Sequence, residues 1–248
     1  MGQRQKRKLC KLLRNYGRKL QGESDPEDWD VSKFSNIEFF YGVIFDQGIR
    51  ADLAWDAPSE LKKRLGHLNP RKIAKMDERD LTKIMRYPKS LHRYRRKMPN
   101  WIIEASNLLV EKYDGKPQKI WSDSPRAGDL QRRFTEFKGI GQKKASMATN
   151  ILVREKNVPV RGVDLSEIDV SSDVHVRRVF LRSGLIDADG VEAAVRAARL
   201  LNPKYPGELD LPAWYIGKQF CHPRMPDCPR CPLSTACPKR VNLNAKAA

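Results

Sequence analysis

Four cysteines near the end of the chain constrain it more than any other feature. They fall within seventeen residues and follow the spacing C-x6-C-x2-C-x5-C: Cys221, Cys228, Cys231 and Cys237. In a chain without a secretory signal, four thiols this close are more typical of metal ligands than of disulfides. Structural zinc usually takes two C-x2-C-like pairs, and only Cys228 and Cys231 form such a pair. Four thiolates from one loop favour a cubane 4Fe–4S cluster, with a zinc-stabilised tail as the alternative.

The charge balance indicates the class of partner. The 248 residues include 48 Lys and Arg against 30 Asp and Glu, which gives a formal net charge of +18 and a pI near 9.9. Such an excess points to a polyanion, and nucleic acid is the usual one. Charge alone predicts a partner and not an activity, because basic binding proteins without catalytic function share this property.

The sequence predicts neither secretion nor a membrane span. No stretch approaches about 18 consecutive apolar residues, and the N-terminus MGQRQKRKLC lacks the apolar region of a signal peptide. We therefore expect a reducing compartment that contains nucleic acid, which is the cytoplasm and nucleoid, or the nucleus in a eukaryote. Cys10 is expected on the buried face of the first helix and not among the ligands.

Helical spacing of apolar residues dominates the rest of the chain. No segment alternates as a strand would, so the prediction is an all-α fold. The segment at residues 22–33 is acidic and rich in turn-forming residues, which indicates a linker. Helices are predicted at residues 3–20, 37–45, 58–66, 70–86, 100–113, 127–137 and 190–201.

The helix at residues 37–45 is predicted to lie at the centre of the core. Ser35 and Glu38 form a capping box, and Phe34 with Phe39 supplies the accompanying hydrophobic contact. The helix is apolar on nearly every side, which is typical of a fully buried helix. It should end at residues 46–48, where the glycine can act as a stop.

Two segments have the composition of a nucleic-acid surface. Residues 87–99 combine six basic side chains with two tyrosines, so that bases could stack and phosphates could pair there. A loop that merely keeps the protein soluble has the same composition. Gly139-Ile140-Gly141 separates two amphipathic helices, and Lys143 and Lys144 follow. Glycines let the backbone approach a phosphate, and the next helix presents free N–H groups to it. This pattern predicts a helix-hairpin-helix that binds DNA backbone without reading sequence.

Asp173 is a second candidate for chemistry. It precedes the helical segment DVHVRRVFLRSG, so its simplest role is that of an N-cap contributing about 1 kcal/mol. The functional interpretation is a carboxylate held at the floor of a pocket.

Together these motifs resemble one family. The cysteine spacing, the hairpin with a lysine two residues past its second glycine, and Asp-Val-His at a helix start resemble the helix-hairpin-helix superfamily of DNA glycosylases, endonuclease III type. The resemblance covers most of the chain and implies two helical lobes flanking a DNA-binding cleft. Residues 36–153 would form one lobe, with the hairpin at 137–145. Residues 1–35 and 154–248 would form the other, with the cluster loop at 221–237.

The resemblance also implies roles for particular residues. Lys143 takes the position of the family's Schiff-base lysine, and Asp173 that of its invariant aspartate. Gln47 takes the position of an amide that fills the gap left by a flipped base, while Leu91 and Tyr94 lie where a wedge enters the duplex. With the hairpin and the basic cluster loop, the further expected DNA contacts are Gly139, Gly141, Lys144, Arg224 and Arg230.

Two departures from the family bear on these roles. Phe137-Lys138-Gly139 stands where Leu-Pro-Gly is usual, and the interval between Lys143 and Asp173 is longer than in the endonuclease III type. Asp164 and Asp169 lie in that longer interval and compete weakly with Asp173. Lys143 could instead be a plain phosphate contact.

The predicted function is that of a monomeric DNA glycosylase with an associated β-lyase (AP lyase) step in base excision repair. The partner would be double-stranded DNA that contains a damaged or mismatched base. A neutral lysine can form an imine with the sugar and permit strand cleavage, while a carboxylate stabilises positive charge at C1′. The alternatives are a non-catalytic binder of damaged or structured DNA and a zinc-tailed nucleic-acid-binding protein. Oxidised pyrimidines, mispaired uracil, thymine or adenine, and oxidised guanine all remain possible substrates.

Overall fold

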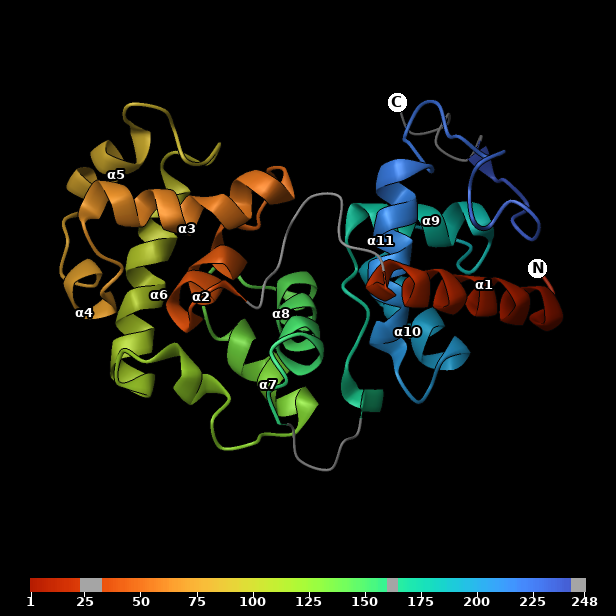
Figure 1. Cartoon of the computed structure of the whole chain (residues 1–248), viewed down its shortest axis with the longest axis horizontal. Coiled ribbons are helices and arrows are strands. Elements are labelled where there is room, and N and C mark those ends of the chain that lie inside the picture. Colours follow the sequence, from red (N-terminus) through yellow and green to blue (C-terminus); the bar gives the residue numbers. More distant parts are fainter. Residues whose placement is uncertain (23–32, 160–164, 242–248) are drawn as a thin grey trace. The chain divides into compact units, whose positions relative to one another are not determined.

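The computed structural model describes residues 1–22, 33–159 and 165–241. Every regular element in these ranges is a helix, which confirms the all-α prediction (Figure 1). Short 3₁₀ helices lie at Pro117–Ile120, Leu165–Glu167 and Pro206–Leu209. The α-helices are α1 (Gln3–Gly22), α2 (Asn36–Phe45), α3 (Ala51–Leu65), α4 (Pro70–Ile73), α5 (Glu78–Arg86), α6 (Lys97–Tyr113), α7 (Ala127–Thr135), α8 (Gln142–Arg154), α9 (Val174–Ser183), α10 (Val191–Leu201) and α11 (Asp210–Gln219).

The chain divides into two compact units. Unit 1 comprises Met1–Pro26 and Asp164–Ala248, and unit 2 comprises Glu27–Val163. The sequence places the boundaries at 35/36 and 153/154 instead. The difference has a local cause, because Lys156 Nζ donates a hydrogen bond to the Phe34 carbonyl at 2.8 Å. Phe34 and Val158 also pack against the core of unit 2. The predicted linker at 22–33 lies mostly outside the described residues, as does Asp164.

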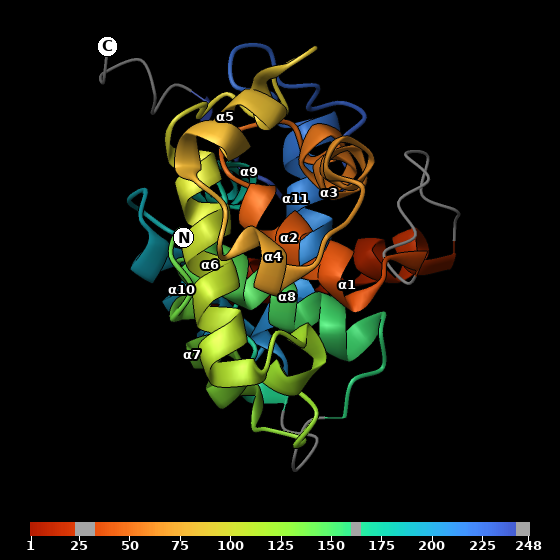
Figure 2. The same cartoon turned by 90° about the vertical axis from the view of Figure 1, so that its left-hand side faces the viewer.

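Helix α2 is the centre of unit 2 (Figure 2). Seven consecutive residues of α2, from Phe39 to Phe45, are buried, and the predicted capping box of Ser35 and Glu38 is present. The helix packs closely on α3, because a Cβ added at Gly42 would lie only 2.6 Å from Cε3 of Trp55. The glycine is therefore needed for this helix contact, and apolar burial on all sides explains the sequence pattern of α2.

The helix boundaries differ from prediction in two places. The predicted helix at 70–86 is two helices, α4 and α5, because the Asp77 side chain accepts a hydrogen bond from Arg79 N at 2.8 Å and caps a new helix. The predicted helix at 58–66 begins earlier, at Ala51, and contains Pro58 within it. Proline is common in the first turn of a helix, which is why Pro58 suggests a helix start. Ala54 and Trp55 are buried, and their packing extends α3 upstream of Pro58.

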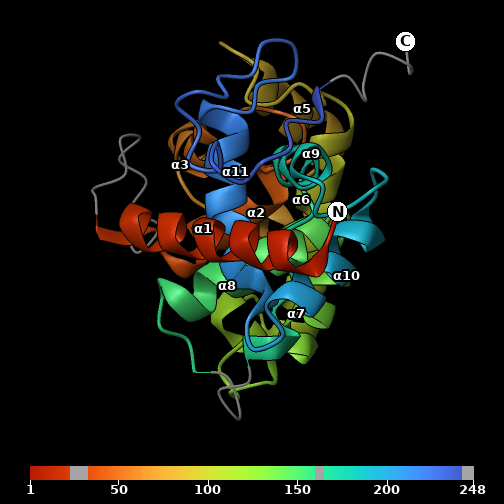
Figure 3. The same cartoon turned by 90° about the vertical axis from the view of Figure 1, so that its right-hand side faces the viewer.

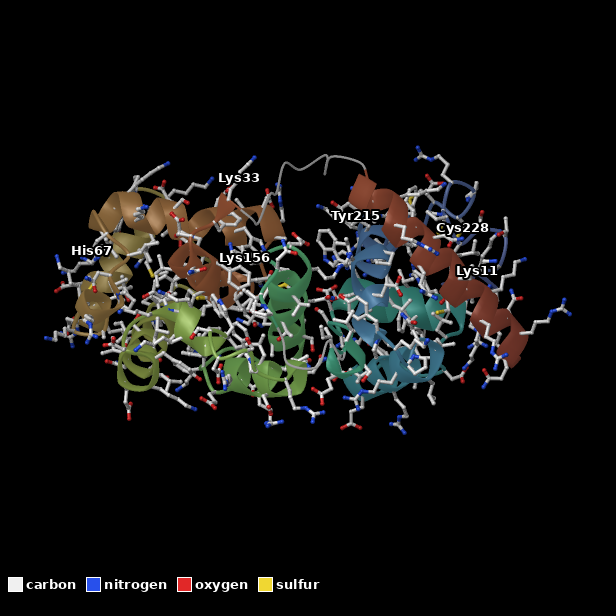
Figure 4. All side chains as sticks on the ribbon, turned by 60° about the horizontal axis from the view of Figure 1, so that its bottom comes forward. Lys11, Lys33, His67, Lys156, Tyr215 and Cys228 are labelled. Carbon is white, nitrogen blue, oxygen red and sulfur yellow. The ribbon has the colours of Figure 1, made fainter. Side chains whose placement is uncertain are left out.

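The core of unit 1 is formed mainly by α1, α9, α10 and α11 (Figure 3). Leu9, Cys10 and Leu13 of α1 are buried in it, which confirms the position predicted for Cys10. The opposite face of α1 is exposed and basic, and Lys11 lies on it (Figure 4). Among the helices described, none combines the length and the apolarity needed to cross a membrane.

Candidate functional site

The two glycines of the hairpin between α7 and α8 differ in their surroundings. A side chain at Gly139 would clash with a neighbouring residue, whereas a side chain at Gly141 would enter open space. Gly139 has φ +81°, and a Cβ there would lie 2.8 Å from Cε3 of Trp101. Gly141 is the N-cap of α8, and a Cβ there would meet no atom within 4 Å. No side chain caps the start of α8. The open space beside Gly141 and the N–H groups that begin α8 together provide the geometry of a phosphate site.

Lys143 lies in the first turn of α8 and forms an ion pair that the sequence analysis did not predict. Its amine donates to Oδ2 of Asp46, the residue that follows α2. The side chain of Lys143 is 31% exposed and that of Asp46 is 8% exposed. The immediate partner of the Lys143 amine is therefore a buried carboxylate.

Lys144 corrects the predicted set of DNA contacts, because its side chain points into unit 2. The residue is 2% exposed, and its Nζ donates to the Ile44 carbonyl at 2.9 Å. The amine also lies 5.8 Å from the centre of the Trp101 ring. Burial lowers the pKa of Lys144 to about 7; Asp46 opposes this shift and Lys143 reinforces it. Lys144 therefore joins α8 to the end of α2 and has no surface to offer a phosphate.

The turn after α2 and the loop at 87–99 meet in space, although the sequence separates them. Arg93 Nη1 donates to the Gly48 carbonyl at 3.1 Å, and the Tyr94 hydroxyl would lie 2.8 Å from a Cβ at Gly48. Half-buried Gln47 and half-buried Tyr94 thus belong to one surface region of unit 2. Leu91 is partly buried against the core, and its N–H donates to the Met85 carbonyl at 2.9 Å.

His92 holds this loop in place, a role that the sequence did not predict. The residue is 3% exposed, and its Nδ1 accepts a hydrogen bond from Tyr94 N at 3.0 Å. Its Nε2 is buried without a hydrogen-bond partner. Burial lowers the pKa of His92 to about 4, while the adjacent backbone of Phe45 and Gln47 acts in the opposite direction. A buried neutral imidazole here carried no sequence signal, because a single histidine within a basic loop has no helical or strand spacing.

Asp173 is the N-cap of α9, as predicted. Its Oδ1 accepts a hydrogen bond from His175 N at 2.5 Å, and the side chain is half-buried. The rival Asp169 forms a two-pronged ion pair with Arg199, at 2.7 and 2.8 Å. That pairing gives Asp169 a structural role within unit 1. The second interpretation of Asp173, as a catalytic carboxylate, stays a prediction.

The four cysteines of the C-terminal loop line one cavity in unit 1, together with apolar side chains that include Val179, Ile216 and Leu233. All four are half-buried free thiols, and Figure 4 labels Cys228 among them. Burial raises the pKa of Cys231 to about 11, and the other three thiols contribute to the shift. As the side chains stand, no group of three or more His, Cys, Asp or Glu within the described residues is arranged to hold a metal ion.

Two buried arginines of α9 hold the cysteine loop. Arg178 Nε donates to the Cys221 carbonyl at 2.6 Å, and Arg182 donates to the carbonyls of His222 and Pro223, both at 2.6 Å. Arg182 Nη1 also lies 3.7 Å from Cys221 Sγ. Two buried positive charges beside four sulfur donors fit a group in which the sulfurs are bound as thiolates, because thiolates carry negative charge. The donor set and its surroundings therefore suit an iron–sulfur cluster.

The two arginines that the sequence analysis assigns to DNA lie on the outside of this loop. Arg224 is exposed. Arg230 is 81% exposed, and its guanidinium pairs with Asp227 three residues earlier. Both therefore remain accessible to a polyanion, and neither contributes to the cysteine-lined cavity.

Comparisons with known proteins give a consistent result. No family model matches the chain. Endonuclease III of Buchnera aphidicola is 27% identical over 149 residues, which are 58% of this chain and 57% of that protein. Endonuclease III of Thermotoga maritima is 27% identical over 68% of this chain and 67% of that protein. The chain thus spans little more than half the length of the first of these relatives.

Solved structures of low sequence identity share the fold over nearly the full length. A non-covalent endonuclease III–DNA complex superposes with a TM-score of 0.71 at 18% identity and covers 97% of this chain and 99% of that one. A thermostable thymine-DNA glycosylase superposes with a TM-score of 0.68 at 14% identity, with coverage of 97% and 99%.

Proposed function

We propose that the chain belongs to the endonuclease III type of the helix-hairpin-helix superfamily of DNA glycosylases, as its 27% identical relatives and the fold shared with solved structures support, and that it excises a damaged or mismatched base from duplex DNA and then cleaves the abasic strand. The observation that carries this proposal is the position of Lys143. It lies two residues past Gly141, in the first turn of the hairpin's second helix, and its side chain is partly exposed.

The proposed chemistry uses Lys143 as the nucleophile. Its neutral amine forms a bond to C1′ of the sugar, the bond from C1′ to the base nitrogen breaks, and a proton passes from the attacking nitrogen to the departing base. The C1′–O4′ bond then opens, O4′ takes a proton from water, and the nitrogen becomes a protonated imine. The resulting imine makes the proton on the neighbouring carbon acidic, so that the 3′ phosphate can leave by β-elimination. We propose that Asp173 stabilises the positive charge that develops at C1′, as carboxylates do at glycosidic centres. Its hydrogen bond with His175 N fixes the carboxylate at the start of α9.

DNA would be held mainly through its backbone. The open space at Gly141 and the uncapped start of α8 would receive a phosphate, and the exposed Arg224 and Arg230 would pair with others. The surface formed by Gln47 and Tyr94, with Leu91 nearby, would fill the space that the extruded nucleotide leaves. We propose that the protein acts as a monomer wherever the cell keeps its DNA under reducing conditions.

We further propose that Cys221, Cys228, Cys231 and Cys237 hold a 4Fe–4S cluster. The cluster would supply iron–thiolate bonds that shape the loop, and Arg178 and Arg182 would balance its negative charge from α9. The finding of zinc instead of iron in anaerobically purified protein would favour the zinc-tailed alternative.

A panel of lesion-bearing duplexes, treated with borohydride in the presence of the enzyme, tests the glycosylase proposal. Borohydride reduces an imine to a stable protein–DNA link, so the assay reports the excised base and the lysine together. We expect Lys143→Ala to abolish trapping, and Asp173→Asn to slow base release by roughly 100-fold or more with little loss of stability, because asparagine is also a good N-cap.

A matched control is Lys112→Ala, which removes a lysine paired with a carboxylate elsewhere in unit 2, on Glu136. This variant should trap DNA as the wild type does. If wild type releases no base and cleaves no strand on any duplex, the protein is a binder of damaged DNA and not an enzyme. If wild type is active and neither Lys143→Ala nor Asp173→Asn lowers base release or strand cleavage, the roles proposed for these two residues are wrong.

A further inference from the structure

Asp46 is a buried carboxylate whose partner is the proposed nucleophile. Its own N–H donates to the Gly42 carbonyl at 3.0 Å, which holds the residue at the end of α2. Its side chain is 8% exposed, and Oδ2 accepts a hydrogen bond from Lys143 Nζ. Two residues earlier, the Ile44 carbonyl accepts from Lys144. The first turn of α8 therefore places two lysines against the end of α2, one on the carboxylate and one on the backbone.

Stability alone is a weak explanation for this pair. A buried ion pair often contributes no more to folding than apolar side chains of the same volume, because both charges lose their hydration. Lys144 already joins α8 to α2 through the Ile44 carbonyl. The pair with Asp46 instead engages the lysine whose amine must lose a proton before it can react.

We infer that Asp46 is the proton partner of Lys143 during imine formation. The inference rests on the proposed function. The ammonium of Lys143 transfers one proton to the Asp46 carboxylate, which leaves a neutral amine and a carboxylic acid. The amine adds to C1′ of an abasic aldehyde and forms a carbinolamine. Asp46 then returns its proton to the carbinolamine hydroxyl, which departs as water as the carbon–nitrogen double bond forms. Asp46 ends as the carboxylate, and the imine carries the positive charge.

Exclusion of water favours the first of these steps. The Lys143 side chain is 31% exposed in the free protein, so water reaches the pair and stabilises its charges. Bound DNA would cover that exposed fraction. In a less polar medium the separated charges become costly, and the neutral amine with a neutral acid gains relative to the ion pair. The proton would therefore move when the substrate is in place.

Other charged groups surround the end of α2. Lys144 faces Asp46 from α8, and its pKa near 7 means that its charge is lost as the pH rises through neutrality. His92 and Arg93 lie in the loop at 87–99; His92 is neutral above about pH 4, and Arg93 binds the Gly48 carbonyl. None of these three residues is changed in the Asp46 variants. Their charges therefore contribute to the pH profile of wild type and to that of each variant.

The inference predicts the shape of a pH profile. An ion pair and the corresponding neutral pair contain the same number of protons, so their ratio does not change with pH while the pair is intact. Imine formation by the wild type should therefore be level across neutral pH, apart from the shallow change that the titration of Lys144 adds to every profile. In Asp46→Asn the amine must release its proton to solvent, so the rate should rise about tenfold per pH unit until the lysine itself is titrated.

The experiment uses full-length protein and a duplex with one preformed abasic site, which removes base excision from the measurement. Borohydride trapping is followed under single-turnover conditions from about pH 6 to about pH 9. We expect Asp46→Asn to trap roughly 100-fold more slowly than wild type at the acid end and to approach it at the alkaline end. Asp46→Glu, which keeps a carboxylate, should be slower but level, and it carries the test if Asp46→Asn does not fold.

Glu38→Gln is the matched control, because it converts a carboxylate paired with Lys62 into an amide at the other end of α2. It should keep the level profile of the wild type. Three results would overturn the inference. They are a profile of Asp46→Asn that runs parallel to that of wild type, trapping by Asp46→Asn that is faster than wild type at every pH, and a profile of Asp46→Glu that slopes. Failure of the proposed function looks different: wild type and Lys143→Ala would then both fail to trap.

Discussion

The two units reach a buried core by different means. Unit 2 packs aromatic side chains from α2, such as Phe40, against others around the helix, such as Trp55 and Phe137, and Phe40 meets Phe137 edge-on with ring centroids 4.9 Å apart. The core of unit 1 is mostly aliphatic, with Phe180 as its one fully buried aromatic among the described residues. Three of the loop cysteines, Cys221, Cys231 and Cys237, pack against that aliphatic core.

This difference indicates what each unit needs in order to fold. Aromatic side chains bury large apolar areas, so unit 2 has a core that needs no other component. In unit 1 the loop contacts the core through thiols and is held to α9 by Arg178 and Arg182. Metal binding and folding are coupled in such an arrangement, because the bound metal stabilises only the folded form.

Loss of the proposed cluster should produce the largest difference in stability between the two units. We expect Cys231→Ser to lose its iron and to speed amide hydrogen exchange in α9 and α11 by orders of magnitude, while α2 and α6 stay protected. Iron analysis and exchange followed by mass spectrometry measure both effects. Cys10→Ala, which alters a buried cysteine outside the loop, should retain iron. Equal loss of protection in α2 would show that unit 2 is not independent.

Lowering the pH should destabilise unit 2, whereas loss of the proposed cluster should destabilise unit 1. His92 is buried with its pKa lowered to about 4, so between pH 6.5 and 4 the unfolded chain binds a proton that the folded chain does not. The stability due to neutral His92 is complete above about pH 6.5 and is lost as the pH falls, by up to about 3 kcal/mol. Urea unfolding of unit 2 at several pH values measures it. His92→Asn should flatten the dependence, whereas His67→Asn should keep it. An unchanged dependence in His92→Asn would refute the assignment.

Substitutions at the two glycines of the hairpin should have different effects, one on the stability of unit 2 and the other on DNA binding. Gly139→Ala introduces a side chain at φ +81° and against Trp101, so it should cost about 2 kcal/mol of unfolding free energy. Gly141→Ala meets open space and should leave stability nearly unchanged, yet weaken binding to any duplex because a methyl group obstructs the phosphate. Urea unfolding and a salt-dependent binding titration distinguish them. Equal loss of stability in both variants would contradict the geometry.

Sequence reasoning succeeded where the signal lies within a few residues. The Ser35–Glu38 capping box, the Asp173 N-cap and the burial of α2 all follow from neighbours in the chain. It failed where partners are distant: Lys143 and Asp46 are 97 residues apart, and Lys144 and Ile44 are 100 apart. No local pattern reports which of two adjacent lysines turns inward, because that choice depends on the end of another helix.

One error could have been avoided from the sequence. Asp77 has the residue type and position of an N-cap within the segment at 70–86, and it divides that segment into α4 and α5. The boundary of unit 2 could not have been located in this way. It depends on the contact of Lys156 with the Phe34 carbonyl, which joins residues 122 positions apart.

Asp173 is the N-cap of helix α9. Later turns of the same helix carry Arg178 and Arg182, the two arginines that hold the cysteine loop. This helix of ten residues thus connects the carboxylate to the segment that holds the four loop cysteines. If the cysteines hold a cluster as proposed, an oxidant that destroyed it would release one end of this helix and shift the carboxylate at the other. Under the proposed function, such a molecule would still bind DNA through the intact hairpin, and it would remain on the damaged site without excising the base.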